Sequence, residues 1–138
     1  MLDSMDMRLI HMLLKNAKIS LAEAGKELGI SQPAARKRLE KLKKKGVVMG
    51  STILLNERRI GWERAILALD VDKSNYLKTV DSIKTTPLVM AVYTTTGPYT
   101  LAVEVLGPVG IVKEVIKQIG RIKGVKELCP LTFVEKIK

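Results

Sequence analysis

The sequence is poor in aromatic residues, cysteine and histidine. Aromatic side chains make up 4% of the 138 residues, so the chain lacks the stacking platforms on which many proteins bind single-stranded nucleic acid. Its one cysteine, Cys129, cannot form an internal disulfide, which favours a reducing, cytoplasmic environment. No apolar run approaches the ~20 residues that span a bilayer. The first residues carry acids and no apolar core, so we also expect no signal peptide.

Catalytic and metal-binding patterns are also missing. The one histidine, His11, lies in an expected helix, and there is no Gly-rich phosphate loop or cluster of metal ligands. Cys129 precedes Pro130 in an expected strand, which is typical of a small core residue rather than a nucleophile. We therefore predict that the protein is not an enzyme, with no metal and no cofactor.

Basic charge is abundant and unevenly distributed. The net charge is +10, and apolar residues make up 46% of the chain, which is enough for an aliphatic core. Residues 1–60 hold 13 Lys and Arg against 6 Asp and Glu, whereas residues 61–138 hold 11 against 8. A basic N-terminal half favours a polyanionic partner such as DNA, RNA or a membrane surface.

Hydrophobic periodicity and capping residues predict three helices in the first 46 residues, over about 5–16, 20–29 and 31–46. Ser20 and Glu23 form a capping box at the start of the second helix, and Gly29 is a suitable end for it. Ser31 can cap the third helix almost at once. Two helices joined by a tight Gly-containing turn predict a helix-turn-helix. The first helix is expected to bury Leu9, Ile10, Leu13 and Leu14 behind a cap at Asp3 or Ser4.

The third helix carries seven Lys and Arg against one acid, Glu40, between residues 31 and 46. Its apolar stripe consists of Ala35, Leu39 and Leu42. In a helix-turn-helix, the N-terminal residues of the second helix contact base edges, and flanking cations contact phosphates. The expected base contacts are Ser31, Gln32, Pro33 and Lys37. The expected phosphate contacts are Arg36, Arg38, Lys41 and Lys44.

The alternative interpretation is an ordinary solvated helix face. Such a face usually mixes charges of both signs, with Glu and Lys four residues apart. Here Glu40 can pair with Lys44, but Lys37, Lys41 and Lys45 lie four residues apart and repel one another. An external polyanion would relieve that repulsion, so we favour double-stranded DNA.

The rest of the chain changes period and predicts a β-α-β-β-α-β, ferredoxin-like domain. The expected strands cover residues 64–71, 88–96, 99–106 and 125–134, and the expected helices cover 74–84 and 108–120. Residues 47–55 suggest one or two short strands, followed by a turn at 56–61. We predict an α+β protein with a (winged) helix-turn-helix over 1–50, a strand and linker over 51–62, and the ferredoxin-like domain over 63–138.

Several stretches of the chain resemble the Lrp/AsnC family, the leucine-responsive and asparagine-synthetase regulators. They are LDSMDMRLIHMLLKNAKISLAEAGKELGIS (2–31), RKRLEKLKKKGVV (36–48), VYTTTG (92–97) and IKGV (122–125). The resemblance implies a transcription regulator whose C-terminal domain senses a ligand. It also implies homodimers that form through the sheets of that domain, often assembled into octamers.

In many members of the family, an amino acid binds between dimers at the loop joining the two central strands. The family's frequent Gly-Asp/Glu-Tyr-Asp pattern reads Gly97-Pro98-Tyr99-Thr100 here, without either acid that could accept from an α-ammonium group. The effector residues that the resemblance implies are Thr95, Thr96, Gly97, Pro98, Tyr99 and Thr100. A plain hairpin with no ligand is the alternative.

Two other functions stay open at this point. An octamer could wrap DNA with little sequence preference and no effector, as an architectural protein. The two-domain layout also resembles that of haem-pathway decarboxylases, but their chemistry needs several His or Arg residues in a cleft, and the second half of this chain has no His.

Overall fold

The chain divides into two compact units, Met1–Leu54 and Leu55–Lys138, in a computed structural model that describes residues 1–138. Leu9, Ala24, Leu28 and Leu42 form the core of the first unit. Aliphatic side chains from strands and helices form the core of the second. No helix is both long and apolar enough to cross a membrane.

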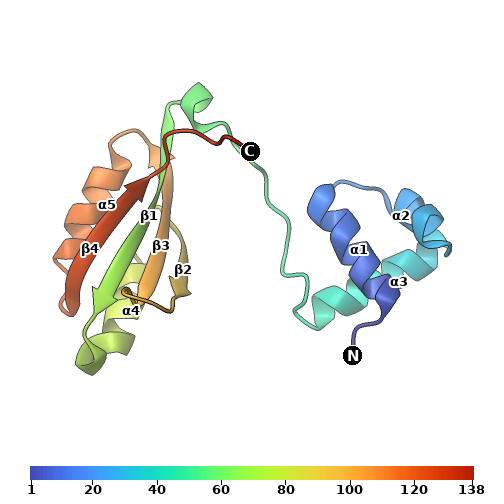
Figure 1. The fold of residues 1–138 in the computed structure, drawn as a ribbon, viewed down its shortest axis with the longest axis horizontal. Helices are drawn as coiled ribbons and strands as arrows, with labels where there is room; N and C mark the ends of the chain where they lie inside the picture. Colours follow the sequence, from blue (N-terminus) through green and yellow to red (C-terminus); the bar gives the residue numbers. More distant parts are fainter. The chain divides into compact units, whose positions relative to one another are not determined.

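The first unit contains three helices, α1 (Ser4–Lys15), α2 (Leu21–Leu28) and α3 (Gln32–Lys44) (Figure 1). The predicted capping box at α2 is confirmed, because the Ser20 hydroxyl accepts from the Glu23 amide and the Glu23 carboxylate accepts from the Ser20 amide. Gly29 ends α2 in the left-handed conformation that its lack of a Cβ permits. These local signals therefore fix where α2 begins and ends.

The first helix has a narrower apolar stripe than predicted. Leu9 is fully buried, and Ile10 and Leu13 pack against the same cluster. Leu14, however, is 78% exposed, so its place in the predicted stripe is wrong. On a helical wheel it lies ~140° from Leu9, beyond the arc that the other two helices cover.

The segment after α3 contains no strand, so the prediction of one or two short strands in residues 47–55 is wrong for the single chain. Met49, Ile53 and Leu54 are exposed there. A strand needs a neighbour for its backbone N–H and C=O groups, and no other strand pairs with these residues. A short 3₁₀ helix, η1 (Glu57–Ile60), follows as the first element of the second unit.

The second unit is a four-stranded antiparallel sheet with two helices. Its elements in chain order are β1 (Trp62–Val71), η2 (Lys73–Asn75), α4 (Tyr76–Lys84), β2 (Val89–Thr94), β3 (Leu101–Pro108), α5 (Ile111–Gly120) and β4 (Val125–Thr132). The strands lie in the order β2-β3-β1-β4, which is the ferredoxin-like arrangement.

One face of this sheet is covered by α4 and α5, and the other is open (Figure 1). Alternate residues of β1 and β3, such as Leu67 and Val103, are buried with Ile83 of α4 and Ile119 of α5. The intervening residues face the open side, because successive side chains of a strand point to opposite faces. The open face therefore has no covering layer within one chain.

Candidate nucleic-acid interface

The start of α3 is defined by two residues. The Ser31 hydroxyl oxygen accepts a hydrogen bond from the Ala34 amide at 3.3 Å, and Pro33 occupies the first turn, where no helical N–H partner is needed. Ala35 and Leu42 are fully buried, and Leu39 is partly buried against the core of the first unit. The predicted apolar stripe is therefore confirmed, and it sets which face of α3 points outward.

The turn between α2 and α3 is held by a close backbone approach. The Ile30 amide donates to the Gly25 carbonyl at 2.9 Å, beyond the left-handed Gly29. A Cβ at Gly25 would lie 2.8 Å from the Ile30 oxygen, so any larger residue there would push the two helices apart. The sequence analysis missed this role of Gly25, although an isolated glycine inside a helix is itself a signal of tight packing.

The outer face of α3 presents cations without counter-charges. Of the residues predicted to contact DNA, these are exposed: Ser31, Gln32, Pro33, Arg36, Lys37, Lys41 and Lys44. The four cations among these residues form no ion pair within 4.0 Å. The expected Glu40–Lys44 pair is also not formed. These residues therefore lie together on the second helix of a helix-turn-helix, and the cations among them have no counter-charge.

Arg38 differs from the other predicted phosphate contacts. Its Nη1 donates to Asp3 Oδ2 at 2.6 Å and to Asp6 Oδ1 at 2.7 Å, and its side chain is only 27% exposed. Arg38 is thus already paired within the chain, unlike the other predicted phosphate contacts. It lies on the flank of α3 that packs beside α1, where two carboxylates already neutralise it.

The two acids form one hydrogen-bonded unit. Each caps the other's backbone, because Asp3 Oδ1 accepts from the Asp6 amide at 2.8 Å and Asp6 Oδ2 accepts from the Asp3 amide at 3.2 Å. Arg38 takes the remaining oxygen of each carboxylate. Its hydrogen bonds, followed by these backbone bonds, hold the pKa of both Asp3 and Asp6 below the usual range, and the pair raises the pKa of Arg38.

The sequence analysis missed Asp6 as a structural partner. Asp6 is fully buried, and it lies three residues before Leu9 and seven before Leu13, on the apolar stripe of α1. An acid on a buried stripe needs a cation or several hydrogen-bond donors. This position was the signal that could have predicted a buried partner such as Arg38.

The loop between β2 and β3 uses many of its polar groups within the chain. The Thr95 hydroxyl donates to the Tyr99 carbonyl at 2.7 Å. Thr100 joins the loop to β1, because its amide donates to the Leu69 carbonyl at 2.8 Å and its hydroxyl accepts from the Val71 amide at 3.1 Å. Two predicted effector residues are thus engaged within the chain, while Thr96, Gly97 and Pro98 at the tip are exposed.

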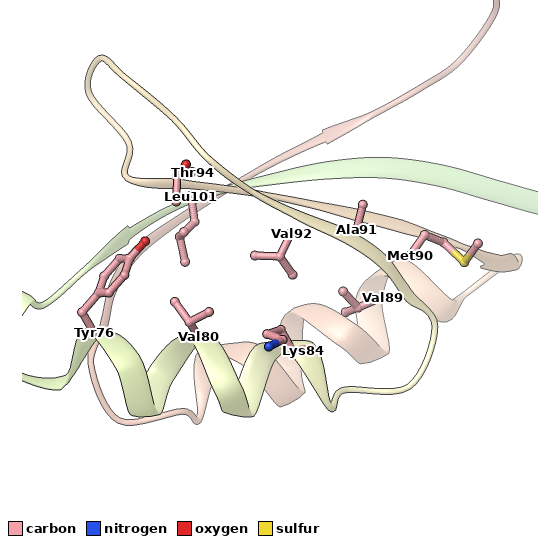
Figure 2. Close-up of a pocket in the computed structure, with 9 residues that line it drawn as sticks. All are labelled: Tyr76, Val80, Lys84, Val89, Met90, Ala91, Val92, Thr94 and Leu101. Carbon is pink, nitrogen blue, oxygen red and sulfur yellow. The ribbon is translucent and has the colours of Figure 1, made fainter. Parts of the chain in front are cut away.

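Two grooves lie in the single chain, and one of them is lined by Thr94 and Leu101, which flank that loop. One, of about 320 Å³, runs between α4 and β2, where Tyr76 and Val80 face Val92 and Leu101 (Figure 2). Another, of about 370 Å³, lies in the first unit and includes His11 and Glu27 in its lining. Neither groove includes any of the predicted effector residues 95–100.

The chain is similar to known transcriptional regulators. Residues 2–43 match the AsnC-type helix-turn-helix domain model. The chain is 29% identical to the HTH-type transcriptional regulator LrpA of Pyrococcus horikoshii over the full length of both proteins. It is 36% identical to the HTH-type transcriptional regulator Ptr1 of Methanocaldococcus jannaschii over 72% of this chain and 68% of that protein.

Solved structures share the same fold. The crystal structure of PH0061 aligns with 100% of this chain over 96% of its own length, at 25% identity and a TM-score of 0.87. The transcriptional regulator NMB0573 of Neisseria meningitidis was solved as an L-Met complex. It aligns with 100% of this chain over 93% of its own length, at 17% identity and a TM-score of 0.81. These structures confirm the predicted α+β fold class over both units.

Proposed function

The chain belongs to the Lrp/AsnC family of transcription regulators, and we propose that it reads double-stranded DNA with the N-terminal turn of α3 while the cations on its outer face bind phosphates. The observation that carries this proposal is the row of exposed, unpaired cations on the second helix of a helix-turn-helix. Each such cation releases counterions when it meets a phosphate, which is the main source of non-specific affinity for DNA.

The proposed contacts divide by their chemistry. Gln32 can make a bidentate pair with adenine, and Lys37 can donate to guanine acceptors, while Ser31 and Pro33 lie in the same first turn. Arg36, Lys41 and Lys44 are the proposed phosphate contacts, and Arg38 is removed from this group. Only the first group carries sequence information, since phosphate contacts fix register alone.

The test is selection of bound fragments from random duplex DNA, followed by fluorescence anisotropy on the selected sequence and on an unrelated one. We expect a selected palindrome with half-sites about one helical turn apart, or a multiple of that, which the two-fold symmetry of a dimer would match. Affinity should fall steeply with salt. An affinity that did not change with salt would contradict the phosphate contacts on α3.

Self-association is proposed to occur through the open face of the sheet. A row of mainly apolar or small side chains crosses it from Tyr93 through Ala102 and Ala68 to Cys129, in strand register. Ile66 and Leu131 lie in the next row, and Tyr93 and Leu131 are more than half exposed. Contiguous apolar surface of this kind is typical of a protein interface. Analytical ultracentrifugation would test for dimers and for larger assemblies.

The exposed loop tip at residues 96–98 is the proposed place for an effector in the assembled protein. The NMB0573 neighbour shows that one protein of this fold was solved with L-Met. The tip has no acid that could accept a hydrogen bond from an ammonium group. We therefore expect it to bind an amino-acid-like molecule that lacks the ammonium group.

Isothermal titration calorimetry with α-amino acids and with the matching 2-oxo acids would test the loop. Heat from the oxo acids alone is the expected result. Binding of an ordinary amino acid would contradict it. No binding by either series would instead favour an architectural, effector-free protein, for which footprinting should show long, periodic protection of DNA rather than short palindromes.

A further inference from the structure

Three contacts tie the helices of the first unit to one another. The backbone of Ile30 and Ser31, just before α3, packs closely against Gly25 of α2, and the Arg8 Nη2 donates to the Glu27 carbonyl at 2.8 Å, which joins α1 to α2. The third contact, between α1 and α3, is the Arg38 cluster, defined as Arg38 with Asp3 and Asp6. With this contact, each of the three helices is linked to the other two.

The Arg38 cluster lies where it can restrict the orientation of α3 on the first unit. The helix rests on the unit through Ala35, Leu39 and Leu42, which form a single narrow stripe. A helix supported along one narrow stripe can rock about it, since apolar contacts are not directional. Arg38 flanks this stripe on the α1 side, so hydrogen bonds from its guanidinium to two fixed carboxylates oppose such rocking.

Both carboxylates are themselves held in place. Every oxygen of Asp3 and Asp6 accepts one hydrogen bond, either from the partner's backbone amide or from Arg38. Asp6 is also fully buried, and its side chain is 0% exposed in the ion pair. A buried carboxylate with all its bonds made is a rigid acceptor, because any movement would leave an acceptor without a partner.

We propose that Arg38 is a positioning residue for DNA reading: the Arg38 cluster sets the angle of α3 on its stripe, and thereby where Gln32 and Lys37 meet the base edges. This inference rests on the proposed DNA-reading function. A shift of about 1 Å is enough to break a bidentate base contact, whereas phosphate contacts through long, flexible side chains tolerate it. The cluster therefore controls sequence discrimination rather than overall affinity.

Arg36 provides a matched control. It lies on the opposite flank of the same stripe, on the same helix, and it is exposed with no acid partner. The same substitution can therefore be made at both positions, as Arg36→Gln and Arg38→Gln. One removes a free cation, and the other removes a cation that already has two counter-charges.

The experiment measures the dissociation constants of each full-length variant for the selected duplex and for an unrelated duplex over a salt series. Arg36→Gln should weaken both duplexes alike and reduce the salt slope by about two, since a dimer loses one phosphate contact in each half-site. Arg38→Gln should leave the slope unchanged and lower the ratio of the two dissociation constants by about 10²-fold, the value of one lost base contact in each half-site. Circular dichroism at the assay temperature confirms that each variant is folded.

Asp3→Asn tests the cluster from the side of α1. Asn still caps a helix well, and Asp3 is half exposed, so the variant should fold. It should lower the ratio less than Arg38→Gln does, because Asp6 still holds Arg38. In the charge-neutral double variant Asp3→Asn/Arg38→Gln, the ratio should equal that of Arg38→Gln alone, since both changes remove the same contact.

Two outcomes would overturn the positioning role. The first is a salt slope reduced by about two in Arg38→Gln with an unchanged ratio, which would make Arg38 a phosphate contact like Arg36 in each half-site. The second is a folded Arg38→Gln protein of lower melting temperature that keeps both slope and ratio, which would make the cluster purely stabilising. A wild type that does not discriminate between the duplexes would instead overturn the DNA-reading function and, with it, the role of Arg38.

Discussion

The two units of the chain are incomplete in different ways. The first has a basic outer face on α3 in which Arg36, Lys37, Lys41 and Lys44 have no counter-charge. In the second, the open face of the sheet carries Arg64 hydrogen-bonded to Glu57 and Glu104, among apolar and small side chains. The outer face of α3 therefore lacks counter-charges, and the sheet of the second unit lacks an apolar covering layer.

This difference indicates two kinds of partner. Unneutralised charge on a narrow helix face is satisfied by a polyanion, and the interaction weakens with salt. A largely apolar face on which Arg64 is already paired is satisfied by another protein surface, and salt affects that contact less. Each prediction below separates these two behaviours.

The largest expected effect is that of salt. With Arg36, Lys41 and Lys44 on each protomer, a dimer makes ~6 phosphate contacts, so DNA affinity should fall about 10³-fold between about 50 and about 200 mM salt. Self-association through the sheet should change by no more than about a few-fold over the same range. Fluorescence anisotropy and sedimentation velocity on the same samples measure the two effects. Equal salt dependence would remove the distinction between the units.

The second prediction introduces a charge into the centre of the open sheet face. Ala68→Glu places a carboxylate between Ala102 and Cys129, where burial against another copy would leave it unpaired. The dissociation constant of the dimer should rise by about 10²–10³-fold, the cost of one uncompensated buried charge.

Sedimentation equilibrium measures the change in dimer stability. Leu77→Glu is the matched control, because it adds the same charge on α4, at a side chain that is 76% exposed on the helical side of the sheet. Leu77→Glu should leave the dimer intact. Dissociation by both variants would place the interface elsewhere.

The third prediction separates the two groups of side chains on α3. Gln32→Ala should lower the preference for the selected duplex by about 10²-fold, with the salt slope kept, because a base contact is lost in each half-site. Lys41→Ala should weaken all duplexes alike and reduce the slope by about two, one contact in each half-site. Anisotropy titrations on two duplexes at several salt concentrations measure both quantities. Identical behaviour of the two variants would contradict the division into base and phosphate contacts.

The smallest expected effect is the acid sensitivity of the first unit. Arg38 lowers the folded-state pKa of Asp3 and Asp6, so their contribution to stability is fully present above about pH 4, the unfolded value. It is lost as the pH falls below that value through the lowered pKa values of the folded state.

Arg38→Gln should therefore flatten the loss of stability of the first unit below about pH 4 and leave that of the second unit unchanged. Thermal unfolding followed by circular dichroism from pH 6 down to about pH 2 measures this change. An acid-dependent loss that is the same in Arg38→Gln and the wild type would show that Arg38 does not set those pKa values.

Sequence reasoning predicted local features well where the cause lay within a few residues. The capping box at Ser20 and Glu23, the end of α2 at Gly29 and the buried stripe from Ala35 to Leu42 are all confirmed. Each depends on hydrogen bonds or side-chain spacing within one or two helical turns. The β-α-β-β-α-β order was predictable for the same reason, because strand and helix periods differ.

The errors arose where the cause was distant in the chain. Arg38 and Asp3 are 35 residues apart, so the charge run around Arg38 gave no sign of which cation would be paired. Residues 47–55 have the composition of a strand, but composition supplies no pairing partner. The hydrogen bonds of the Thr100 hydroxyl to β1 were likewise not predictable, because it is the register of β1 and β3 that brings Leu69 and Val71 beside it.

The sequence by itself determined the two-unit organisation of elements, the basic character of α3 and the face that α3 buries. These follow from residue spacing and capping, which act over short stretches of chain. Only the tertiary structure decided which of the basic side chains stay free. Charges pair according to distance in space, and it is the packing of α1 beside α3 that brings Asp3 and Asp6 to Arg38 and leaves Arg36, Lys41 and Lys44 exposed.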